Sequence, residues 1–276
     1  MRSGPPPPGA IKHITSLANP LVKDIRALAL PKNRKASGQF VAEGLKLVGE
    51  AIEAGWTART LVYAADVANQ PLVQRLSTIV HARGGSVLTV SEAILAKISR
   101  RDNPQTVLGV FEQKLTPAGS IGPSGDQVWV ALEGIRDPGN LGTIVRTADA
   151  VGAAGVILIG DTVDPFSMEA VRATMGSIFA VPLSRVSRED FAKLAAAWPG
   201  TIVGTHLAAS VDYRKAEYHG PVMLLMGTEQ SGLTAETAAA ATTLVKIPMA
   251  GKADSLNLAI ATAVMLFEIR RPSLKL

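Results

Sequence analysis

The sequence predicts an α/β protein with two domains, the second of which is built on a parallel sheet. Three observations support this prediction. The chain has 276 residues, of which 47% are hydrophobic, enough to fill two cores. Short apolar runs alternate with stretches of helical periodicity along the chain. In the second half these runs are continuously apolar, which is typical of strands buried on both faces of a parallel sheet.

The elements of the first domain are expected within residues 11–113. The segment Asn19-Pro20 starts a helix that Pro31 ends, and residues 32–38 are expected to form a basic turn. Further helices are expected at 45–54, 72–82 and 92–98, the last capped by Ser91, and strands at 39–42, 60–64, 86–90 and 106–111. The Gly-, Pro- and Ser-rich residues 114–127 are predicted to be a linker.

The second domain is expected to span residues 128–276. Strands are predicted at 128–133, 156–160, 180–184, 201–205, 222–226 and 244–249. Helices are predicted at 143–151, 165–177, 188–198 with Ser187 as cap, from 234, and from Ser255, whose hydroxyl suits an N-cap. The last helix carries almost no charge before Glu268, so we expect it to be buried or to lie at a subunit contact.

Composition excludes several classes of protein. No run of about 18 apolar residues occurs, so no transmembrane helix is expected. Residues 1–10 are Pro-rich, lack the apolar segment of a signal peptide, and are expected to be a disordered tail. Cysteine is absent and the four histidines are scattered, which argues against disulfides, thiolate chemistry and a metal site. We therefore expect a cytoplasmic protein.

The net positive charge lies at the start of the chain. Residues 1–50 hold eight Lys/Arg and three Asp/Glu, a net of 8 − 3 = +5, whereas the remainder holds 20 of each. Such a cluster is typical of proteins that bind a polyanion, so nucleic acid is a candidate partner. The alternative is a solvated helix face with a basic loop.

Three loops follow predicted strands at the positions where parallel sheets bind ligands. The loop 134–142 contains Asn140 and leads to Arg146 in the next helix, without the G-x-G-x-x-G spacing of dinucleotide sites. The loop 227–232 carries Glu229 between two glycines. Taken singly, each has an ordinary explanation: a helix cap for Asn140, a surface ion pair for Arg146 and a solvated turn for Glu229.

The third loop, 250–257, joins the last strand to the last helix. Before it, Ile247-Pro248-Met249 carries backbone groups able to bind an adenine. Ser255 and Asn257 lie at the start of an otherwise apolar helix, where free N–H groups and the helix dipole attract polar ligand groups. A core helix with a serine cap is the alternative.

Together the three loops resemble a known family. The patterns N-x-G-x-x-x-R, G-x-E-x-x-G and I-P-M followed by S-L-N are similar to those of the SpoU (TrmH-like) RNA ribose methyltransferases of the SPOUT superfamily. The match runs from residue 128 to the end of the chain and includes RATMGSIFAVPL at 172–183. The segments LANPLVK, FVAEG and PQTVLGV resemble the family's substrate-binding domain, which has a ribosomal-protein-like α/β fold.

The resemblance implies transfer of the methyl group of S-adenosylmethionine to a ribose 2′-hydroxyl of rRNA or tRNA. It also implies a trefoil knot in the second domain and a homodimer with sites near the interface. The polar motif positions, implied to be catalytic, are Asn140, Arg146, Glu229, Ser255 and Asn257. The cofactor is implied to lie among Thr205, Leu225, Met226, Gly227, Ile247, Met249, Ser255 and Leu256. RNA is expected to contact the first domain at Lys32, Arg34 and Lys35.

This chemistry asks the protein to align the hydroxyl oxygen, the methyl carbon and the sulfur, and to help remove a proton. Arg146 is normally protonated, so we expect it to orient the hydroxyl and stabilise charge rather than act as a base. Asn140 is expected to hold the ribose, and Glu229 to position Arg146 or a partner loop. Two other functions compete: a nicotinamide-dependent oxidoreductase, disfavoured by the missing glycine motif, and a non-catalytic RNA-binding protein with a methyltransferase-like fold.

Overall fold

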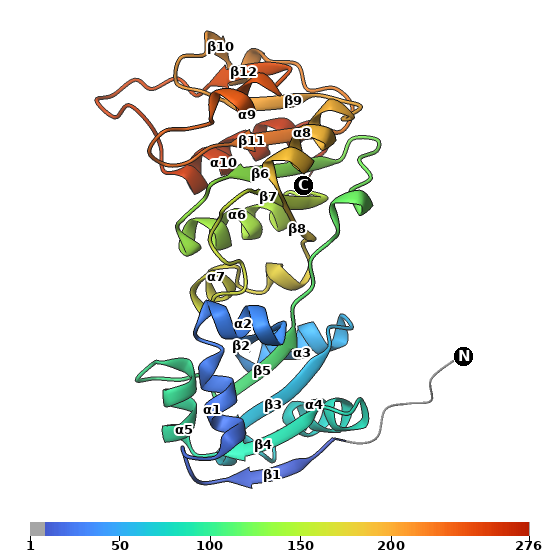
Figure 1. Ribbon diagram of the computed structural model, residues 1–276, viewed down its shortest axis with the longest axis vertical. Coiled ribbons are helices and arrows are strands. Elements are labelled where there is room, and N and C mark those ends of the chain that lie inside the picture. The colour runs from blue at the N-terminus through green and yellow to red at the C-terminus, as the bar shows by residue number, and fades with distance from the viewer. Residues whose placement is uncertain (1–8, 276) are drawn as a thin grey trace. The chain divides into compact units, whose positions relative to one another are not determined.

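The chain folds into two compact units (Figure 1). The structure, a computed structural model, describes residues 9–275, so the predicted tail falls almost wholly outside the described residues. The first unit runs to Gln113 and also includes Phe166–Arg172, and the second comprises Lys114–Pro165 and the chain from Ala173 onward. Within residues 9–275 no helix combines the length and apolarity needed to cross a membrane.

A five-stranded mixed sheet forms the centre of the first unit, in the order β1-β4-β3-β5-β2. Strands β1, β4 and β3 run parallel, and β5 is antiparallel to both β3 and β2. The strands are β1 (Ile11–Ile14), β2 (Gln39–Glu43), β3 (Ala58–Ala64), β4 (Ser86–Val90) and β5 (Val107–Glu112). The helices are α1 (Pro20–Ala27), α2 (Pro31–Ser37), α3 (Leu45–Glu53), α4 (Pro71–Ala82) and α5 (Glu92–Ser99).

The first unit differs from the sequence prediction at α1, α2 and β1. Residues 32–38 are not a basic turn, because α2 covers Pro31–Ser37 and ends at Gly38, which has a φ of 65°. Proline suits the first turn of a helix and glycine the position after its last turn, so Pro31 starts α2. It does not end the previous helix, because α1 already stops at Ala27. The edge strand β1 was not predicted, since only Ile14 of its four residues is buried and no apolar alternation marks it.

The segment Phe166–Arg172 lies within the sequence range of the second unit, but it packs in the first unit. The ring of Phe166 lies 4.8 Å from that of Phe40, measured between centroids. The Arg172 guanidinium donates to the Glu43 carboxylate and to the Ser99 carbonyl oxygen. The predicted helix 165–177 was too long, because α7 spans only Met168–Ala173 and Met175 and Gly176 take positive φ values of 50° and 106°.

The second unit contains a seven-stranded sheet in the order β10-β12-β9-β11-β6-β7-β8, with every pairing parallel. Its strands are β6 (Val128–Glu133), β7 (Gly155–Ile159), β8 (Leu183–Val186), β9 (Ile202–Thr205), β10 (Val211–Asp212), β11 (Val222–Met226) and β12 (Thr243–Lys246). Its helices are α6 (Pro138–Ala150), α8 (Arg188–Ala196), α9 (Ala235–Ala239) and α10 (Leu258–Arg270). The predicted α/β class and parallel sheet are confirmed.

Both faces of this sheet are buried. Trp129 and Ala131 pack in one core cluster with Phe191 of α8, and the alternate residues Val130 and Leu132 are also fully buried. Successive side chains of a strand point to opposite faces, so helices cover both sides. The other side carries α6 and α10, which pack against each other and contact β7 and β11.

The predicted linker 114–127 is part of the second unit. The Thr116 N–H donates to the Leu183 carbonyl at 2.7 Å, beside the start of β8. The Ile121 side chain is 7% exposed and belongs to the core cluster that contains Trp129. The segment is irregular, as its lack of periodicity indicated. It packs against the second unit and does not hang free between the two units.

Four element boundaries in the second unit differ clearly from the prediction. Strand β12 spans Thr243–Lys246 instead of 244–249, so Ile247, Pro248 and Met249 lie outside it. Helix α6 starts at Pro138 rather than at 143, because Asp137 is its N-cap and accepts from the Asn140 N–H at 2.6 Å. Strand β8 spans Leu183–Val186 instead of 180–184. Helix α10 starts at Leu258 rather than at Ser255, with Asn257 as N-cap.

The order of the sheet brings the important loops together. Strands β12, β9, β11 and β6 are adjacent and parallel, so their carboxyl ends share one edge. The loops that leave this edge are those predicted to bind a ligand. The trefoil knot stays a prediction, because strand order alone does not define how the connections thread.

Candidate active site

A pocket of about 310 Å³ opens at the carboxyl edge of the second sheet. Its volume lies within the range of small-molecule sites, about 300–1,000 Å³. The lining comes from the segments after β9, β11 and β12 and from the start of α10. The lining residues are Thr205, His206, Leu207, Met226, Gly227, Thr228, Glu229, Gln230, Ser231, Gly232, Val245, Lys246, Ile247, Met249, Asp254, Ser255, Leu256, Leu258 and Ala261.

The pocket combines an apolar wall with backbone outside regular structure. Met226, Ile247 and Met249 contribute apolar surface, and the Thr205 hydroxyl donates to the Met226 sulfur at 3.4 Å. Between β12 and α10, residues 247–256 form neither helix nor strand. Peptide groups in such a segment are able to face a ligand rather than a helix or sheet partner. The wall therefore suits a flat heteroaromatic group with polar edges.

A tight loop after β11 holds Glu229 at this pocket. The N–H groups of Thr228 and Gly232 each donate to the other residue's carbonyl oxygen at 3.0 Å. The Thr228 hydroxyl also accepts from the Ser231 N–H at 3.0 Å. A Cβ at Gly227 would lie 1.9 Å from the carbonyl carbon of Gly232, so only glycine permits this approach of the two backbone segments.

Three of the predicted polar residues form one hydrogen-bonded chain. Asn257 Oδ1 accepts from the Ala259 and Ile260 N–H groups at 2.9 and 3.3 Å. Asn257 Nδ2 donates to Asn140 Oδ1 at 3.0 Å, and Asn140 Nδ2 donates to Glu229 Oε1 at 2.9 Å. Residues separated by up to 117 positions in the sequence thus meet, and the chain reaches the pocket at Glu229, which lines it, whereas Asn140 and Asn257 are not among the lining residues.

The helix start fixes the direction of every bond in this chain. Backbone N–H groups only donate, so the Asn257 oxygen must face them and its NH₂ group must point to Asn140. Asn140 must then present its oxygen to Asn257, which leaves its own NH₂ group for the Glu229 carboxylate. The chain therefore ends in an acceptor, and the second carboxylate oxygen of Glu229 is able to receive a ligand's donor.

A buried carboxylate that the sequence analysis missed supports the same loop. Glu133, at the end of β6, is 1% exposed and accepts from Arg188 Nη1 at 2.8 Å. It also accepts from the N–H and the hydroxyl of Thr234, both at 2.9 Å. Glu133 thereby ties the end of the 227–234 segment to the adjacent strand. The signal was available, since a charged residue ends an otherwise apolar strand.

Comparison with known proteins now identifies the family. Residues 127–267 match the model of the SpoU rRNA Methylase family, and residues 19–109 match the MRM3-like substrate binding domain. This chain belongs to the SpoU rRNA methylase family. The family predicted from the three loops is confirmed.

Individual SpoU proteins resemble nearly the whole chain. The structure of an AdoMet-bound rRNA methyltransferase from Sinorhizobium meliloti is 54% identical, with a TM-score of 0.92, over 97% of this chain and 100% of that one. The 23S rRNA (uridine(2479)-2′-O)-methyltransferase of Streptomyces viridochromogenes is 31% identical over 95% of this chain and 93% of its own length. The structure of AviRb from that organism, with AdoMet, has a TM-score of 0.82 at 30% identity and covers 92% of this chain and 98% of that one.

Most of the predicted SpoU cofactor residues border the pocket. Thr205, Met226, Gly227, Ile247, Met249, Ser255 and Leu256 all line it. Leu225 does not, because its fully buried side chain packs in the core cluster with Trp129. Met226 and Leu225 are neighbours in sequence and point to opposite faces of the sheet, so only Met226 borders the pocket. A cofactor contact of Leu225 stays a prediction.

Arg146 stands apart from the other polar SpoU motif residues. It lies on α6, six residues after Asn140, which corresponds to about 9 Å along the axis and about 240° around it. Its side chain is exposed, does not line the pocket, and has no ion pair with any of residues 9–275. The Glu229 carboxylate accepts from Asn140, and no ion pair joins it to Arg146 within residues 9–275. That Glu229 positions Arg146 or a partner loop stays a prediction.

One predicted RNA contact is corrected by the structure. Arg34 is 2% exposed and its Nη1 donates to the carbonyl oxygens of Leu28 and Ala29 at 2.7 and 3.0 Å. It holds the turn between α1 and α2 and is not a surface cation. Lys32 and Lys35 on the same helix are exposed. Their role in RNA binding stays a prediction.

Clear pKa shifts occur only near β10 among the described residues. Hydrogen bonds from the Arg214 side chain and backbone lower the pKa of Asp212 to about 2, and the same carboxylate raises the pKa of Arg214. Burial, assisted by the charge of Glu268, raises the pKa of Tyr218 to about 12. None of these three residues lines the pocket.

Proposed function

We infer that this protein transfers the methyl group of S-adenosylmethionine to a ribose 2′-hydroxyl of RNA. The observation that carries this conclusion is the pocket at the carboxyl edge of the second sheet, which the Asn257–Asn140–Glu229 chain reaches at Glu229. The pocket lining combines apolar side chains, irregular backbone and the Glu229 carboxylate that ends the polar chain.

The donor and acceptor set fits S-adenosylmethionine. Met226, Ile247 and Met249 offer apolar contact to an adenine ring, and irregular backbone beside them offers hydrogen bonds to its edge. Glu229 and Ser255 supply a carboxylate and a hydroxyl for polar and cationic groups. When bound, this cofactor supplies an electrophilic methyl carbon that needs no activation by a metal ion.

The residues of the chain have to place a hydroxyl in line with that carbon and accept a proton. Asn140 is held on both sides of its amide, so its remaining lone pair and second N–H point in fixed directions. Such pre-organised groups lower the entropy lost on reaching the reactive geometry. Glu229 keeps one carboxylate oxygen for the substrate or cofactor, and Arg146 provides positive charge for the developing alkoxide.

We propose ribosomal RNA, and 23S rRNA in particular, as the substrate. The support is twofold: the model matched by residues 19–109 describes a substrate-binding domain, and the Streptomyces relative is named as a 23S rRNA methyltransferase. The decisive experiment incubates the protein with methyl-tritiated S-adenosylmethionine and an unmodified 23S rRNA transcript. A 2′-O-methyl group blocks alkaline cleavage at its own phosphodiester, so the label is expected in alkali-stable dinucleotides. Label in mononucleotides, or RNA binding without transfer, would contradict the proposal, and the second outcome would favour a non-catalytic RNA-binding protein.

We also propose that the protein is a homodimer in which Arg146 serves the partner's pocket. Arg146 projects about 120° away from Asn140 around α6, and α6 packs beside α10. On α10, Ile260 and Phe267 are 51% and 50% exposed and lie two turns apart on one stripe. An exposed apolar stripe on α10 and an exposed arginine on the helix packed against α10 suit a symmetric interface.

Subunit complementation tests this arrangement. The variants Arg146→Ala and Asn140→Ala are each expected to lose methyl transfer, and Arg146→Ala is expected to keep wild-type affinity for S-adenosylmethionine. Co-refolding the two in equal amounts should restore about a quarter of the wild-type activity, because half of the dimers are mixed and each mixed dimer holds one intact composite site. No recovery in mixtures that light scattering shows to be dimeric would place Arg146 outside the partner's site.

A further inference from the structure

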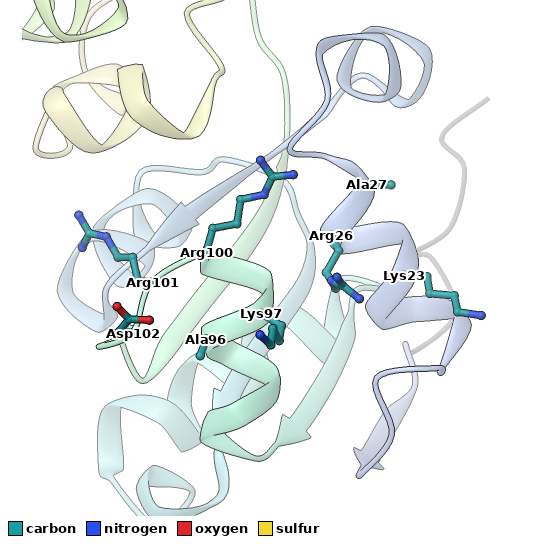
Figure 2. Close-up of a pocket in the computed structure, with 8 residues that line it drawn as sticks. All are labelled: Lys23, Arg26, Ala27, Ala96, Lys97, Arg100, Arg101 and Asp102. Carbon is teal, nitrogen blue, oxygen red and sulfur yellow. The ribbon is translucent and has the colours of Figure 1, made fainter.

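A cationic groove lies in the first unit, away from the residues of the pocket described above. We propose that this groove, between α1 and α5, binds the phosphate backbone of the RNA substrate. The proposal rests on the proposed function for the identity of the substrate, and it names the surface that holds it. Figure 2 shows the groove with its basic side chains on the two helices and on the turn that follows α5.

The groove has the size and the lining of a backbone-binding surface. Its volume is about 480 Å³. The lining contains five cations, one carboxylate and two alanines, which are Lys23, Arg26, Ala27, Ala96, Lys97, Arg100, Arg101 and Asp102. No aromatic ring and no large apolar side chain lines it, so base stacking and apolar peptide binding are both disfavoured. A row of cations around small side chains instead favours a polyanion.

None of the five cations is neutralised by the part of the chain that the structure describes. Lys23, Arg26, Lys97, Arg100 and Arg101 are all exposed, and no ion pair joins any of them to a carboxylate within residues 9–275. Other basic residues of this unit behave differently, since Arg59 pairs with Glu112 and Arg75 with Glu53. Uncompensated like charges repel one another, and a bound phosphate chain would relieve that repulsion.

The packing of the two helices fixes where these charges point. Ile25 on α1 and Leu95 and Ile98 on α5 are buried, and the two helices are in contact. Lys23 and Arg26 are three residues apart on α1 and so lie on one helix face, whereas Lys97 lies in the last turn of α5 and Arg100 is the residue that caps it. The small side chains of Ala27 and Ala96 leave the space between these faces open.

Arg100 provides an independent indication of function. Its φ is 57°, a left-handed conformation that costs a non-glycine residue about 1 kcal/mol or more and that glycine would adopt freely. The Arg100 N–H donates to the Ala96 carbonyl oxygen and ends α5 in this conformation. An arginine at a position that favours glycine keeps a cation at the rim of the groove at the expense of backbone stability.

The groove lies at other residues than the RNA-binding surface expected from the sequence. That expectation rested on Lys32, Arg34 and Lys35, of which Arg34 is buried. Three of the five groove cations come from residues 97–101, a local basic cluster within residues 51–276, which hold equal numbers of Lys/Arg and Asp/Glu overall. Only folding brings them next to Lys23 and Arg26. The surface is therefore built from two segments about 70 residues apart.

The test compares two triple variants of the full-length protein with equal net charge. The groove variant combines Arg26→Gln, Lys97→Gln and Arg100→Asn, the last because asparagine tolerates the left-handed conformation. The control variant combines Lys12→Gln, Lys46→Gln and Arg75→Gln, which are exposed cations outside the groove. Affinity for an unmodified 23S rRNA transcript is measured by filter binding between 0.05 and 0.5 M salt, and unfolding by circular dichroism checks that both variants fold.

The groove variant should bind RNA more weakly, and its binding should depend less on the salt concentration. Loss of three phosphate contacts lowers the slope of log K against log salt by about 2 to 3, which corresponds to roughly 50-fold weaker binding at 0.15 M salt. The control variant should stay within about threefold of wild type. A charge-conserving variant, Arg26→Lys with Lys97→Arg, should keep both affinity and slope. Equal affinities of the groove and control variants would overturn the proposal.

Two further readouts separate this proposal from the proposed function. Affinity for S-adenosylmethionine, measured by calorimetry, should be the same in the groove variant and in wild type. In the transfer assay the groove variant should show a raised KM for RNA with an unchanged kcat at saturating RNA. If wild type binds the transcript but transfers no methyl group, the catalytic proposal fails while the binding comparison still decides the groove.

Discussion

The polarity of the Asn257–Asn140–Glu229 chain predicts the effect of an almost isosteric substitution. In Asn140→Asp, an oxygen replaces the NH₂ group that now donates to Glu229 Oε1 at 2.9 Å. The bond from Asn257 Nδ2 is retained, because it goes to the other terminal atom of residue 140. The substitution thus turns one attraction into a contact between two carboxylates and leaves the rest of the chain in place.

The distance sets the size of the penalty. Two unit charges about 3 Å apart repel by about 1.4 kcal/mol at the dielectric constant of water and by about 5 kcal/mol at an effective constant of 20. Glu229 is exposed and its side chain is able to turn away, so we expect the lower end, a destabilisation of about 1.5 kcal/mol. Lowering the pH should reduce this destabilisation, because one of the two carboxyl groups then takes up a proton.

A double-mutant cycle isolates this term. Glu229→Gln alone should change stability by less than about 0.5 kcal/mol, because the new amide oxygen still accepts from Asn140. In the double variant N140D/E229Q the new amide donates to the new carboxylate, so most of the lost stability should return. Urea unfolding at pH 8 measures all four proteins, with a coupling energy of about 1.5 kcal/mol expected. If N140D and N140D/E229Q are equally destabilised, the assigned polarity is refuted.

Two other substitutions test the framework around the site. Gly227→Ala places a Cβ 1.9 Å from the Gly232 carbonyl carbon and should cost about 3 kcal/mol and at least tenfold in S-adenosylmethionine affinity by calorimetry, whereas Gly251→Ala, where the space is open, should cost neither. Wild-type cofactor affinity in a folded G227A protein would contradict the role of this loop. Arg34→Ala should destabilise the protein by about 2 to 4 kcal/mol in urea unfolding, because two carbonyl groups lose a charged donor. The control Lys35→Ala should change stability by less than about 0.5 kcal/mol. Equal effects of the two substitutions would show that Arg34 does not stabilise the fold.

Sequence patterns located most strands because each buried strand is a compact apolar run. The predicted bounds of β4, β6 and β11 agree with the structure to the residue. The predicted starts of α1, α3, α5 and α8 also agree, whereas those of α6 and α10 do not. The start of α6 was missed although Asp137-Pro138 carries an N-cap and a first-turn proline, because the glycines after it suggested a loop. Packing by α6 outweighs the low helix propensity of Gly139 and Gly142.

The residues that line the pocket could be predicted from the sequence, but the hydrogen bonds among the site residues could not. Loops after adjacent parallel strands must share an edge, so topology alone brings Met226, Ile247 and Ser255 together. No periodicity could show that Asn140 binds Glu229, since that contact depends on where α6 begins and how the 228–232 loop closes on itself. The cationic groove was equally hidden, because three of its five cations lie in residues 51–276, where the charges balance overall, and only the fold brings them beside Lys23 and Arg26.

Asn257 shows why cap and site residue are not true alternatives. The sequence allowed either a helix cap or a ligand contact at this helix start, and it assigned the cap to Ser255. In the structure Asn257 caps α10 with its oxygen, and this same bond obliges its NH₂ group to face Asn140. Ser255, free of the capping role, lines the pocket instead. The dipole and the free N–H groups of α10 therefore act on the site through an amide chain that they orient, and removing the cap is expected to disorder Asn140 and Glu229 together.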